Sequence, residues 1–313
     1  MPSAALYGGF AHASALWEVY VAPKPGLVDR LGSGAHTDMH YGTFVSSALA
    51  LAPFWSQQCE EGLSGLSPGK AFPRLRSRGV AMEEVMFAAT KGINTHKGLI
   101  FVLSLLLYGT GKALEEGEPL SAERICARGG SCVAGMVEAE LEPLKKNLPP
   151  RPLTHGERLY LEHGITGIRG EAERGFPSLW SAGLPALEKA LGEGHSLHHA
   201  GLYALLHLML ATEDSTVIHR GGYAFWKTEY REMIREVLLR GAPFCSSGES
   251  ALVELDREFS RRRISPGGSA DLLSATFFLH FCLLREQQMR LHGAAATSPP
   301  EESKFAREMI FSS

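Results

Sequence analysis

Apolar residues recur at helical spacing through most of this chain, whereas the alternating patterns of a β-strand are almost absent. Spacings of three and four residues place side chains on one face of a helix, and a half-buried strand needs a period of two. Segments rich in Ala, Leu, Glu and Met also favour helices. The pattern therefore predicts an all-α fold: a single multi-helix bundle domain over residues 1–313, with its functional site in the interhelical loops.

The composition supplies such a bundle with a core, because 44% of the 313 residues are hydrophobic. Lys and Arg number 31 against 34 Asp and Glu, and this net charge of −3 argues against a nucleic-acid-binding protein. Five cysteines without a Cys-x-x-Cys pair indicate neither a disulfide framework nor a zinc site. No signal peptide is visible, and the apolar runs fall short of the roughly 20 residues that span a bilayer. We expect a cytoplasmic protein without a membrane segment.

The apolar spacing and the Gly and Pro residues place the helices. A first helix over residues 10–21 is expected to end at Pro-Lys-Pro-Gly, and a second begins at Asp38 with Thr37 as its N-cap. Residues 57–77, rich in Gly, Ser and Pro, are expected to form a connecting loop. The helix over residues 99–108 is apolar on every face, which predicts a central position. Further helices are expected at residues 121–144, 185–191, 199–211, 224–240, 250–261 and 270–288, and a loosely ordered tail at 292–313.

Four polar clusters fall in the breaks between these helices, where loops held by a scaffold commonly carry function. In the first, Asp38 could simply favour a helix start through the helix dipole, or Asp29, His36 and Asp38 could converge on a metal or supply a base. In the second, residues 91–98, two glycines flank Asn-Thr-His-Lys at a helix start. Backbone N–H groups, a hydroxyl and a cation suit an anion site there, although a capped turn accounts for the same residues.

The third cluster follows an apolar helix and ends in paired glycines. Asp214 could cap a turn and His219 could be a satisfied interior histidine, or both could take part in chemistry. In the fourth, residues 265–273, a glycine loop leads into an apolar helix, with Ser269 as a natural N-cap and Asp271 in the first turn. Alternatively, Asp271 could hold Mg²⁺ that grips phosphate oxygens.

Together the clusters resemble one family, the triphosphoribosyl-dephospho-CoA synthases. The matching stretches lie in the same order between residues 18 and 285: PKPGLVD (23–29) with SGAHTDM (33–39), TKGINTHKG (90–98), GIRGEAERGFP (167–177), HRGG (219–222) and SPGGSADLL (265–273). This chain departs from the family at residues 214–217, which read DSTV where the family has Asp-Thr-Asn-Val, so Thr216 stands in the place of an Asn.

The resemblance implies an all-helical enzyme that joins ATP and 3′-dephospho-CoA, releases adenine and forms 2′-(5″-triphosphoribosyl)-3′-dephospho-CoA. That product is the precursor of the prosthetic group on the acyl carrier subunits of citrate lyase and malonate decarboxylase, so a companion transferase would consume it. No nucleic acid or membrane is expected as a partner, and an apolar helix near the C-terminus could form a homodimer contact. The alternatives are a Mg²⁺-dependent helical hydrolase of N-glycosidic or ADP-ribosyl bonds, and a noncatalytic nucleotide-binding protein.

The implied reaction breaks a glycosidic bond, so it needs a carboxylate near an oxocarbenium-like sugar and a group that moves a proton. We expect one or two Mg²⁺ ions on the triphosphate. Their expected ligands are Asp38, Glu84, Asp214 and Asp271. The expected catalytic residues are His36, Asp38, His96 and His219. The expected substrate-binding residues are Lys24, Lys91, Asn94, Thr95, Lys97, Arg169, Glu171, Arg220, Ser265, Gly267, Gly268 and Ser269.

Overall fold

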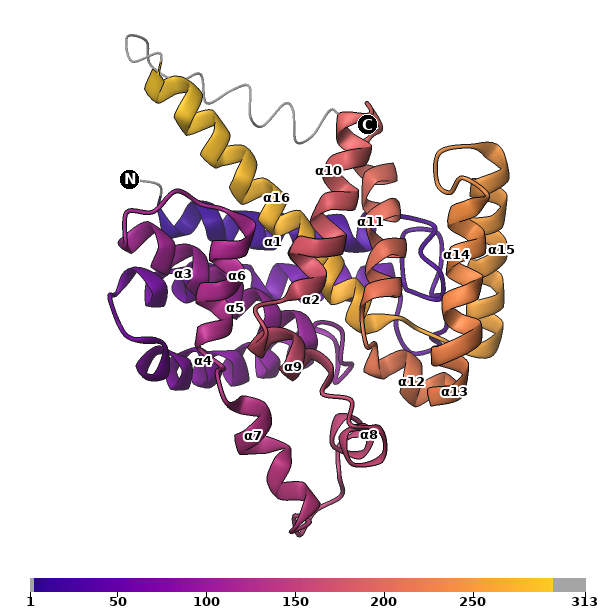
Figure 1. The fold of residues 1–313 in the computed structure, drawn as a ribbon, viewed down its shortest axis with the longest axis horizontal. Coiled ribbons are helices and arrows are strands. Elements are labelled where there is room, and N and C mark those ends of the chain that lie inside the picture. Colours follow the sequence, from indigo (N-terminus) through magenta and orange to yellow (C-terminus); the bar gives the residue numbers. More distant parts are fainter. Residues whose placement is uncertain (1–2, 295–313) are drawn as a thin grey trace.

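The structure, a computed structural model, describes residues 3–294, and within this range it is a bundle of helices without a β-strand (Figure 1). The predicted all-α class is confirmed. Short 3₁₀ turns lie at Ala52–Phe54 and Glu142–Lys145, and π-helical turns at Leu179–Gly183 and Trp226–Tyr230. The α-helices are α1 (Ala4–Tyr20), α2 (Tyr41–Leu51), α3 (Trp55–Leu63), α4 (Pro68–Ala89), α5 (Lys97–Glu115), α6 (Ala122–Ser131), α7 (Met136–Glu140), α8 (His155–His163), α9 (Gly167–Glu173), α10 (Leu184–Gly192), α11 (Leu197–Ala211), α12 (Ser215–Gly221), α13 (Tyr223–Phe225), α14 (Arg231–Leu239), α15 (Ser246–Arg262) and α16 (Gly267–Ala294).

Helix α5 lies at the centre of the bundle, as its apolar faces predict. Helices α3, α4, α6 and α16 pack against it, and most of its residues are buried. Glycines permit the closest of these contacts. A Cβ on Gly62 would lie 2.2 Å from the Tyr108 carbonyl oxygen, and one on Gly111 would lie 2.1 Å from that of Cys59. The backbones of α3 and α5 can therefore touch only because these positions carry no side chain.

Two helices are longer than the sequence runs suggested. Lys97–Glu115 and Gly267–His292 are long and apolar enough to cross a membrane by length and composition alone, and 72% of each apolar window is buried inside the bundle. This burial accounts for their apolar character, because a core helix contacts neighbours on every face. Residues 292–294 still belong to α16, and the rest of the predicted tail lies outside the described residues.

Residues 57–77 do not form the predicted loop. Helix α3 continues to Leu63, and α4 begins at Pro68 after a short connection. The composition misled the prediction for two reasons. Gly62 is required for the close contact with α5, and a proline at the first position of a helix loses no hydrogen bond, because the N–H groups of the first turn have no helical acceptor.

The start of α2 also differs from the prediction. Helix α2 begins at Tyr41, and the backbone N–H of His40 donates to Thr43 Oγ1 at 3.3 Å. Thr37 is therefore not the N-cap, and Asp38 lies in the preceding loop rather than in the first helical turn.

Two further boundaries are corrected. The predicted helix 121–144 is interrupted before Gly135, whose φ of 77° is a left-handed conformation that favours glycine. Helix α16 begins two residues before Ser269, so this serine lies inside the helix and is not its N-cap, and Asp271 lies beyond the first turn.

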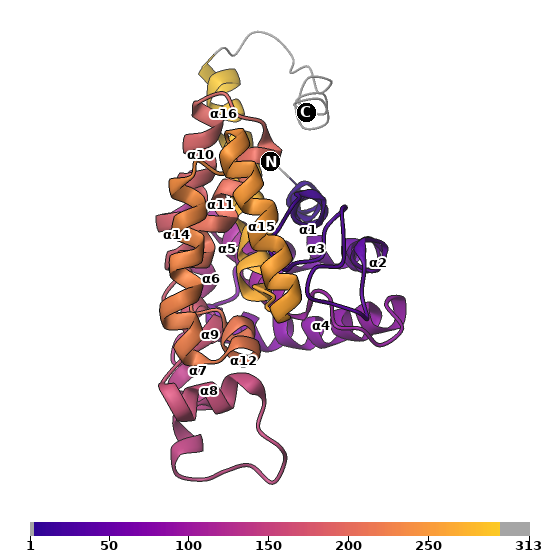
Figure 2. The same ribbon diagram turned by 90° about the vertical axis from the view of Figure 1, so that its right-hand side faces the viewer.

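Helices α7 and α8 project from one end of the bundle (Figures 1 and 2). Leu141, Leu144 and Tyr160 form a small core between them, separate from the large core, to which α7 contributes Met136 and α8 contributes Leu159. We call α7, α8 and the segment between them the arm. The arm also contacts the bundle through Glu140, which forms ion pairs with residues of α4 and α9, and through the Val137 N–H, which donates to Glu173 of α9.

Candidate functional site

The sequence motifs meet where α5 and α16 begin. His36, in the loop between α1 and α2, forms a hydrogen bond from Nε2 to Ser265 Oγ at 2.9 Å, just before α16. The carboxylate of Asp271 lies against Gly98 in the first turn of α5, where an added Cβ would be 2.1 Å from Asp271 Oδ2. The chain therefore brings three of the polar clusters together at two helix N-termini.

Asp214 ties the start of α12 to the start of α16. Its Oδ1 accepts hydrogen bonds from the backbone N–H groups of Thr216 (3.0 Å) and Val217 (3.4 Å) and from the Thr216 hydroxyl (2.6 Å). Its Oδ2 accepts from the backbone N–H (2.8 Å) and the hydroxyl (2.9 Å) of Ser269. The Thr216 hydroxyl also accepts from Gly267 N–H at 2.9 Å. Asp214 is 1% exposed, and this satisfied carboxylate fixes the glycine loop in place.

A buried ion pair joins α1 to the loop that follows it. Lys24 is 1% exposed, and its ammonium donates to the Glu18 carboxylate and, at 2.7 Å, to the Glu18 carbonyl oxygen. The Lys24 backbone N–H donates to Asp29 Oδ2 at 2.8 Å. Burial raises the pKa of Glu18, and Lys24 opposes that shift. Lys24 is therefore occupied by Glu18 and does not reach the surface.

Asp271 is the acid whose surroundings are most unusual. Burial raises its pKa well above the ordinary value, and the negative charges of Glu18 and Asp214 raise it further, whereas the backbone N–H of Leu99 lowers it. Three carboxylates thus interact around the start of α16, with Lys24 as the cation paired to one of them. A positive charge at Asp271 would relieve this repulsion.

His96 is a buried neutral imidazole at the start of α5. It is 2% exposed, and its Nδ1 lies 2.7 Å from Ser47 Oγ. Burial, with a further contribution from the positive charge of Lys24, lowers its pKa to about 3. Its Nε2 is buried and has no hydrogen-bond partner within the described residues. The ring is therefore uncharged near neutral pH.

His36 lies in a more open environment. Burial and the positive charge of Arg220 lower its pKa, whereas Asp38, whose Oδ1 is 3.8 Å from Nδ1, opposes the shift. Arg220 donates from Nη1 to the Arg263 carbonyl oxygen at 3.3 Å. The structure therefore brings together the predicted residues His36, Asp38, Arg220 and Ser265.

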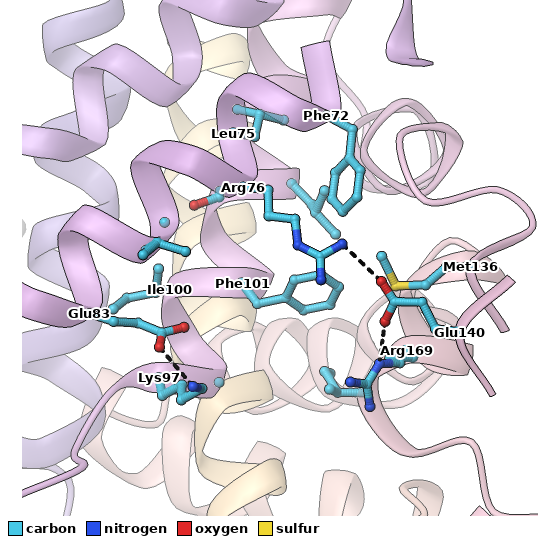
Figure 3. A pocket seen from close by; sticks show the side chains of 16 residues that line it. Phe72, Leu75, Arg76, Glu83, Lys97, Ile100, Phe101, Met136, Glu140 and Arg169 are labelled. Carbon is cyan, nitrogen blue, oxygen red and sulfur yellow. Dashed lines mark hydrogen bonds and ion pairs between the residues drawn. The ribbon is translucent and has the colours of Figure 1, made fainter. Parts of the chain in front are cut away.

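Two cavities lie near this centre. The first, of about 430 Å³, is lined by residues of α4, α5, α7 and α9, among them Lys97, Gly98 and Arg169 (Figure 3). The second, of about 240 Å³, is lined by residues that include Glu171, Asp214 and Gly268. Both cavities share Ile168 in the first turn of α9. Asp271 lines neither cavity, but its carboxylate contacts Gly98 at the first cavity, and the charge of Asp214, which lines the second, raises its pKa.

The remaining residues of the second polar cluster have varied surroundings. Lys91 is exposed, with φ of 57°, and Asn94 Oδ1 accepts from the Lys97 backbone N–H at 3.2 Å. The Thr95 hydroxyl is buried and has no hydrogen-bond partner among residues 3–294. Lys97 forms an ion pair of 2.7 Å with Glu83 at the first cavity. Asn94 thus satisfies a backbone N–H at the start of α5, while the Lys97 side chain lines the first cavity.

Three other predicted residues are placed as follows. Glu171 is buried, and its Oε1 accepts from Ser178 N–H at 2.7 Å. His219 lies on α12 with its ring centre 3.5 Å from that of His155, and burial and neighbouring cations lower its pKa. Glu84 is exposed on α4. None of the three contacts Asp271 through an identified hydrogen bond or ion pair.

The structure does not gather the four acids expected to bind metal. Within the described part of the chain, no group of three or more His, Cys, Asp or Glu side chains is arranged to hold a metal ion. Asp38 and Glu84 are exposed, and the oxygens of Asp214 are occupied by hydrogen-bond donors. Asp271 is the remaining member of the set, and it contacts Gly98 at the wall of the first cavity.

The sequence interpretation missed Glu18, Arg76 and Glu140. Glu18 carried a detectable signal, because it follows Ser14 by four residues and therefore lies on the same buried face of α1. Arg76 lay in a segment wrongly expected to be a loop. Glu140 gave no signal, because its role depends on residues of α4 and α9 that are distant in the sequence.

Comparisons with known proteins agree with the sequence motifs. The CitG family, described as ATP:dephospho-CoA triphosphoribosyl transferase, matches residues 4–290. A protein of Streptococcus equi subsp. zooepidemicus (strain H70) is 39% identical over 285 residues, which cover 87% of this chain and 94% of the relative. One of Albidiferax ferrireducens is 40% identical over 274 residues, covering 87% and 89%. One of Photobacterium profundum is 39% identical over 281 residues, covering 88% and 86%.

Each of these relatives is named a probable 2-(5″-triphosphoribosyl)-3′-dephosphocoenzyme-A synthase. No solved structure matches this chain significantly. The family match spans nearly all of the described helices, including every segment that forms the centre around Asp271. The chain therefore belongs to the CitG family of ATP:dephospho-CoA triphosphoribosyl transferases.

Proposed function

We propose that this protein joins ATP and 3′-dephospho-CoA, releasing adenine and forming 2′-(5″-triphosphoribosyl)-3′-dephospho-CoA. Family membership supports the substrate pair. The observation that carries the proposal is the pair of cavities that share Ile168, with the Asp271 carboxylate against Gly98 at the wall of the first. A transferase with two large substrates needs two adjoining subsites and a charged group near the point where they meet.

The reaction exchanges one bond at C1′ of the ATP ribose. The bond to adenine breaks, a ribose hydroxyl oxygen of dephospho-CoA bonds to C1′, and the hydroxyl proton balances the one that adenine gains. Positive charge develops on the sugar in between, and the acidic surroundings of Asp271 favour it. We assign His36 as the group that accepts the hydroxyl proton. Its imidazole is neutral, and it hydrogen bonds to the loop that leads to the second cavity.

Mg²⁺ is proposed to enter with the triphosphate. It is typically bound through one or two carboxylates together with substrate phosphates, so a preformed cage of protein ligands is not required. Burial raises the pKa of Asp271 and the negative charges of Glu18 and Asp214 raise it further, and a cation bound to Asp271 would relieve the repulsion among these carboxylates. Asp38, beside His36, is a second candidate. Asp214 is less suited because hydrogen-bond donors already occupy its oxygens, and Glu84 is less suited because it is exposed on α4 and makes no identified contact with Asp271. Bound Mg²⁺ would neutralise part of the triphosphate charge.

Other parts of the proposal concern the cellular setting. The product would serve as a prosthetic-group precursor for the acyl carrier subunit of citrate lyase or malonate decarboxylase, after transfer by a companion enzyme. Five free cysteines support a reducing, cytoplasmic location.

A homodimer is the proposed oligomeric state, which gel filtration with light scattering would test. A single mass on that column equal to one chain would refute the dimer.

The test of the function is adenine release. The protein is incubated with ATP and Mg²⁺, with and without dephospho-CoA, and adenine and the joined product are followed by chromatography and mass spectrometry. Release that requires dephospho-CoA supports the transferase. Release without the acceptor would identify a hydrolase, and no release would identify a nucleotide-binding protein.

The Asp271→Asn variant tests the residue assignment. Because the folded protein favours the neutral form of Asp271, an amide of the same shape should preserve the fold. The amide cannot lose a proton when Mg²⁺ or a positively charged sugar lies beside it, as the carboxyl can, so we expect kcat to fall about 10²–10³-fold, the typical effect of removing one group that stabilises developing charge. Glu232→Gln, at a side chain 71% exposed on α14, is the matched control and should retain wild-type activity.

A further inference from the structure

The first cavity contains a feature that the reaction described above does not use. Arg76 of α4 and Arg169 of α9 both bind the same carboxylate, that of Glu140 at the end of α7 (Figure 3). Arg76 Nη1 lies 2.9 Å from Glu140 Oε1, and Arg169 Nε lies 3.0 Å from Glu140 Oε2. One carboxylate thus occupies two guanidinium groups at the wall of a cavity.

The chemistry of this cavity suits a phosphate ester attached to an aromatic base. Phe72 and Phe101 line it beside the arginines, as Figure 3 shows, and Lys97 adds a third cation. Three cations face two acids, Glu140 and Glu83, so the polar groups of the wall carry a net positive charge. Arginine pairs bind the oxygens of phosphate in the same forked geometry as those of carboxylate. Aromatic rings provide flat surfaces against which a base can stack.

We propose that the first cavity binds the phosphate of an adenine nucleotide through Arg76 and Arg169, and that this phosphate displaces Glu140. Glu140 then acts as an internal competitor, which holds both guanidinium groups in position until substrate arrives. The exposure of the three side chains supports exchange, because Arg76 is 63%, Glu140 27% and Arg169 33% exposed. A partly hydrated ion pair of this kind contributes little to stability, so breaking it costs little.

The proposal rests on the proposed function for its ligand class, because both substrates are adenine nucleotides. The probes are therefore ATP and dephospho-CoA, titrated separately into the protein by calorimetry. We expect Arg76→Ala and Arg169→Ala to weaken binding of one nucleotide by about 10-fold or more, the effect of losing a charge-assisted hydrogen bond. We expect Glu140→Gln to tighten the binding of that same nucleotide severalfold, because the competing charge is gone. Arg74→Ala, on an exposed side chain of the same helix, is the control.

The opposite signs distinguish this role from a structural one. If the ion pairs only fastened the arm to the bundle, all three substitutions would loosen the cavity and weaken binding together, and this result would overturn the proposal. Unchanged affinity for both nucleotides in the arginine variants, with dephospho-CoA-dependent adenine release intact, would overturn it while leaving the proposed function standing. Wild-type protein that bound neither nucleotide would overturn both. The nucleotide that shows the expected pattern is the occupant of the first cavity.

Discussion

Replacing Asp214 by Asn separates a structural carboxylate from a metal ligand. The amide of the Asp214→Asn variant has a single oxygen, so it can satisfy only one of the two sets of donors that the native carboxylate satisfies. With this oxygen toward Thr216 and Val217, the NH₂ group faces Ser269. The Ser269 hydroxyl can turn and accept from the NH₂ group, but the buried backbone N–H of Ser269 is left without its acceptor.

The size of the effect follows from this count. A hydrogen bond to a charged acceptor contributes about 1.5–3 kcal/mol, and a buried donor left without an acceptor costs about 1–3 kcal/mol. The free energy of unfolding should fall by about 3 kcal/mol. For 313 residues, an unfolding entropy of roughly 2 cal/mol/K per residue converts this loss into a fall in Tm of about 5 °C.

The assay is thermal and urea unfolding followed by circular dichroism, with and without Mg²⁺. A structural carboxylate predicts the same loss of stability in both conditions. A loss that appears only in the presence of Mg²⁺ would refute the structural assignment, as would a change smaller than about 0.5 kcal/mol, the usual range for surface substitutions. Glu232→Gln is the control, because the Glu232 side chain is 71% exposed and its substitution should leave stability unchanged in both conditions.

Three further predictions concern the same centre. Gly98→Ala places a Cβ where Asp271 Oδ2 lies and should lower kcat about 10²-fold by displacing the carboxylate. Gly69→Ala, at the equivalent position of α4 with open space around it, should have no effect, and equal kcat values for the two variants would refute the prediction. Because the pKa of His96 falls from 6.5 to about 3 on folding, its contribution to stability is complete above pH 6.5 and is lost as pH falls toward 3. Between pH 6.5 and about 3, the free energy of unfolding of the wild type, measured with urea, should fall by about 1.4 kcal/mol per pH unit relative to that of His96→Asn. Parallel pH profiles of the two proteins would contradict the burial of a neutral His96. Lys24→Met leaves the Glu18 carboxylate buried without its cation and should lower the free energy of unfolding by about 3–5 kcal/mol. Adding Glu18→Gln should restore part of this loss, and an unchanged stability of Lys24→Met would count against the buried ion pair.

Helix spacing predicted the bundle, because periodicity records which face of each helix is buried. The same signal placed α5 at the centre. It failed at residues 57–77, where Gly62 serves a close helix contact and Pro68 begins a helix. Gly and Pro residues have the same local signature whether they end a helix or permit tight packing, and only the partner helix distinguishes the two.

The sequence predicted which segments form the candidate site, but it predicted the roles of the individual residues less well. The motifs at His36, Gly98, Asp214 and Asp271 do come together. Roles depend on neighbours that sequence order does not reveal: Asp214 is saturated by donors from two helices, and Lys24 is occupied by Glu18. These pairings become visible only when the helices are packed.

Helix α16 begins at the carboxylate centre and continues for 28 residues, so its axis is about 42 Å long. Leu291, which is 71% exposed, follows Asp271 by 20 residues and lies about 30 Å farther along that axis. A fluorophore or spin label attached there would be remote from the chemistry yet connected to it by one continuous helix. The distance from such a label to a labelled nucleotide would show which of the two cavities each substrate occupies, with α16 as a fixed reference of known length.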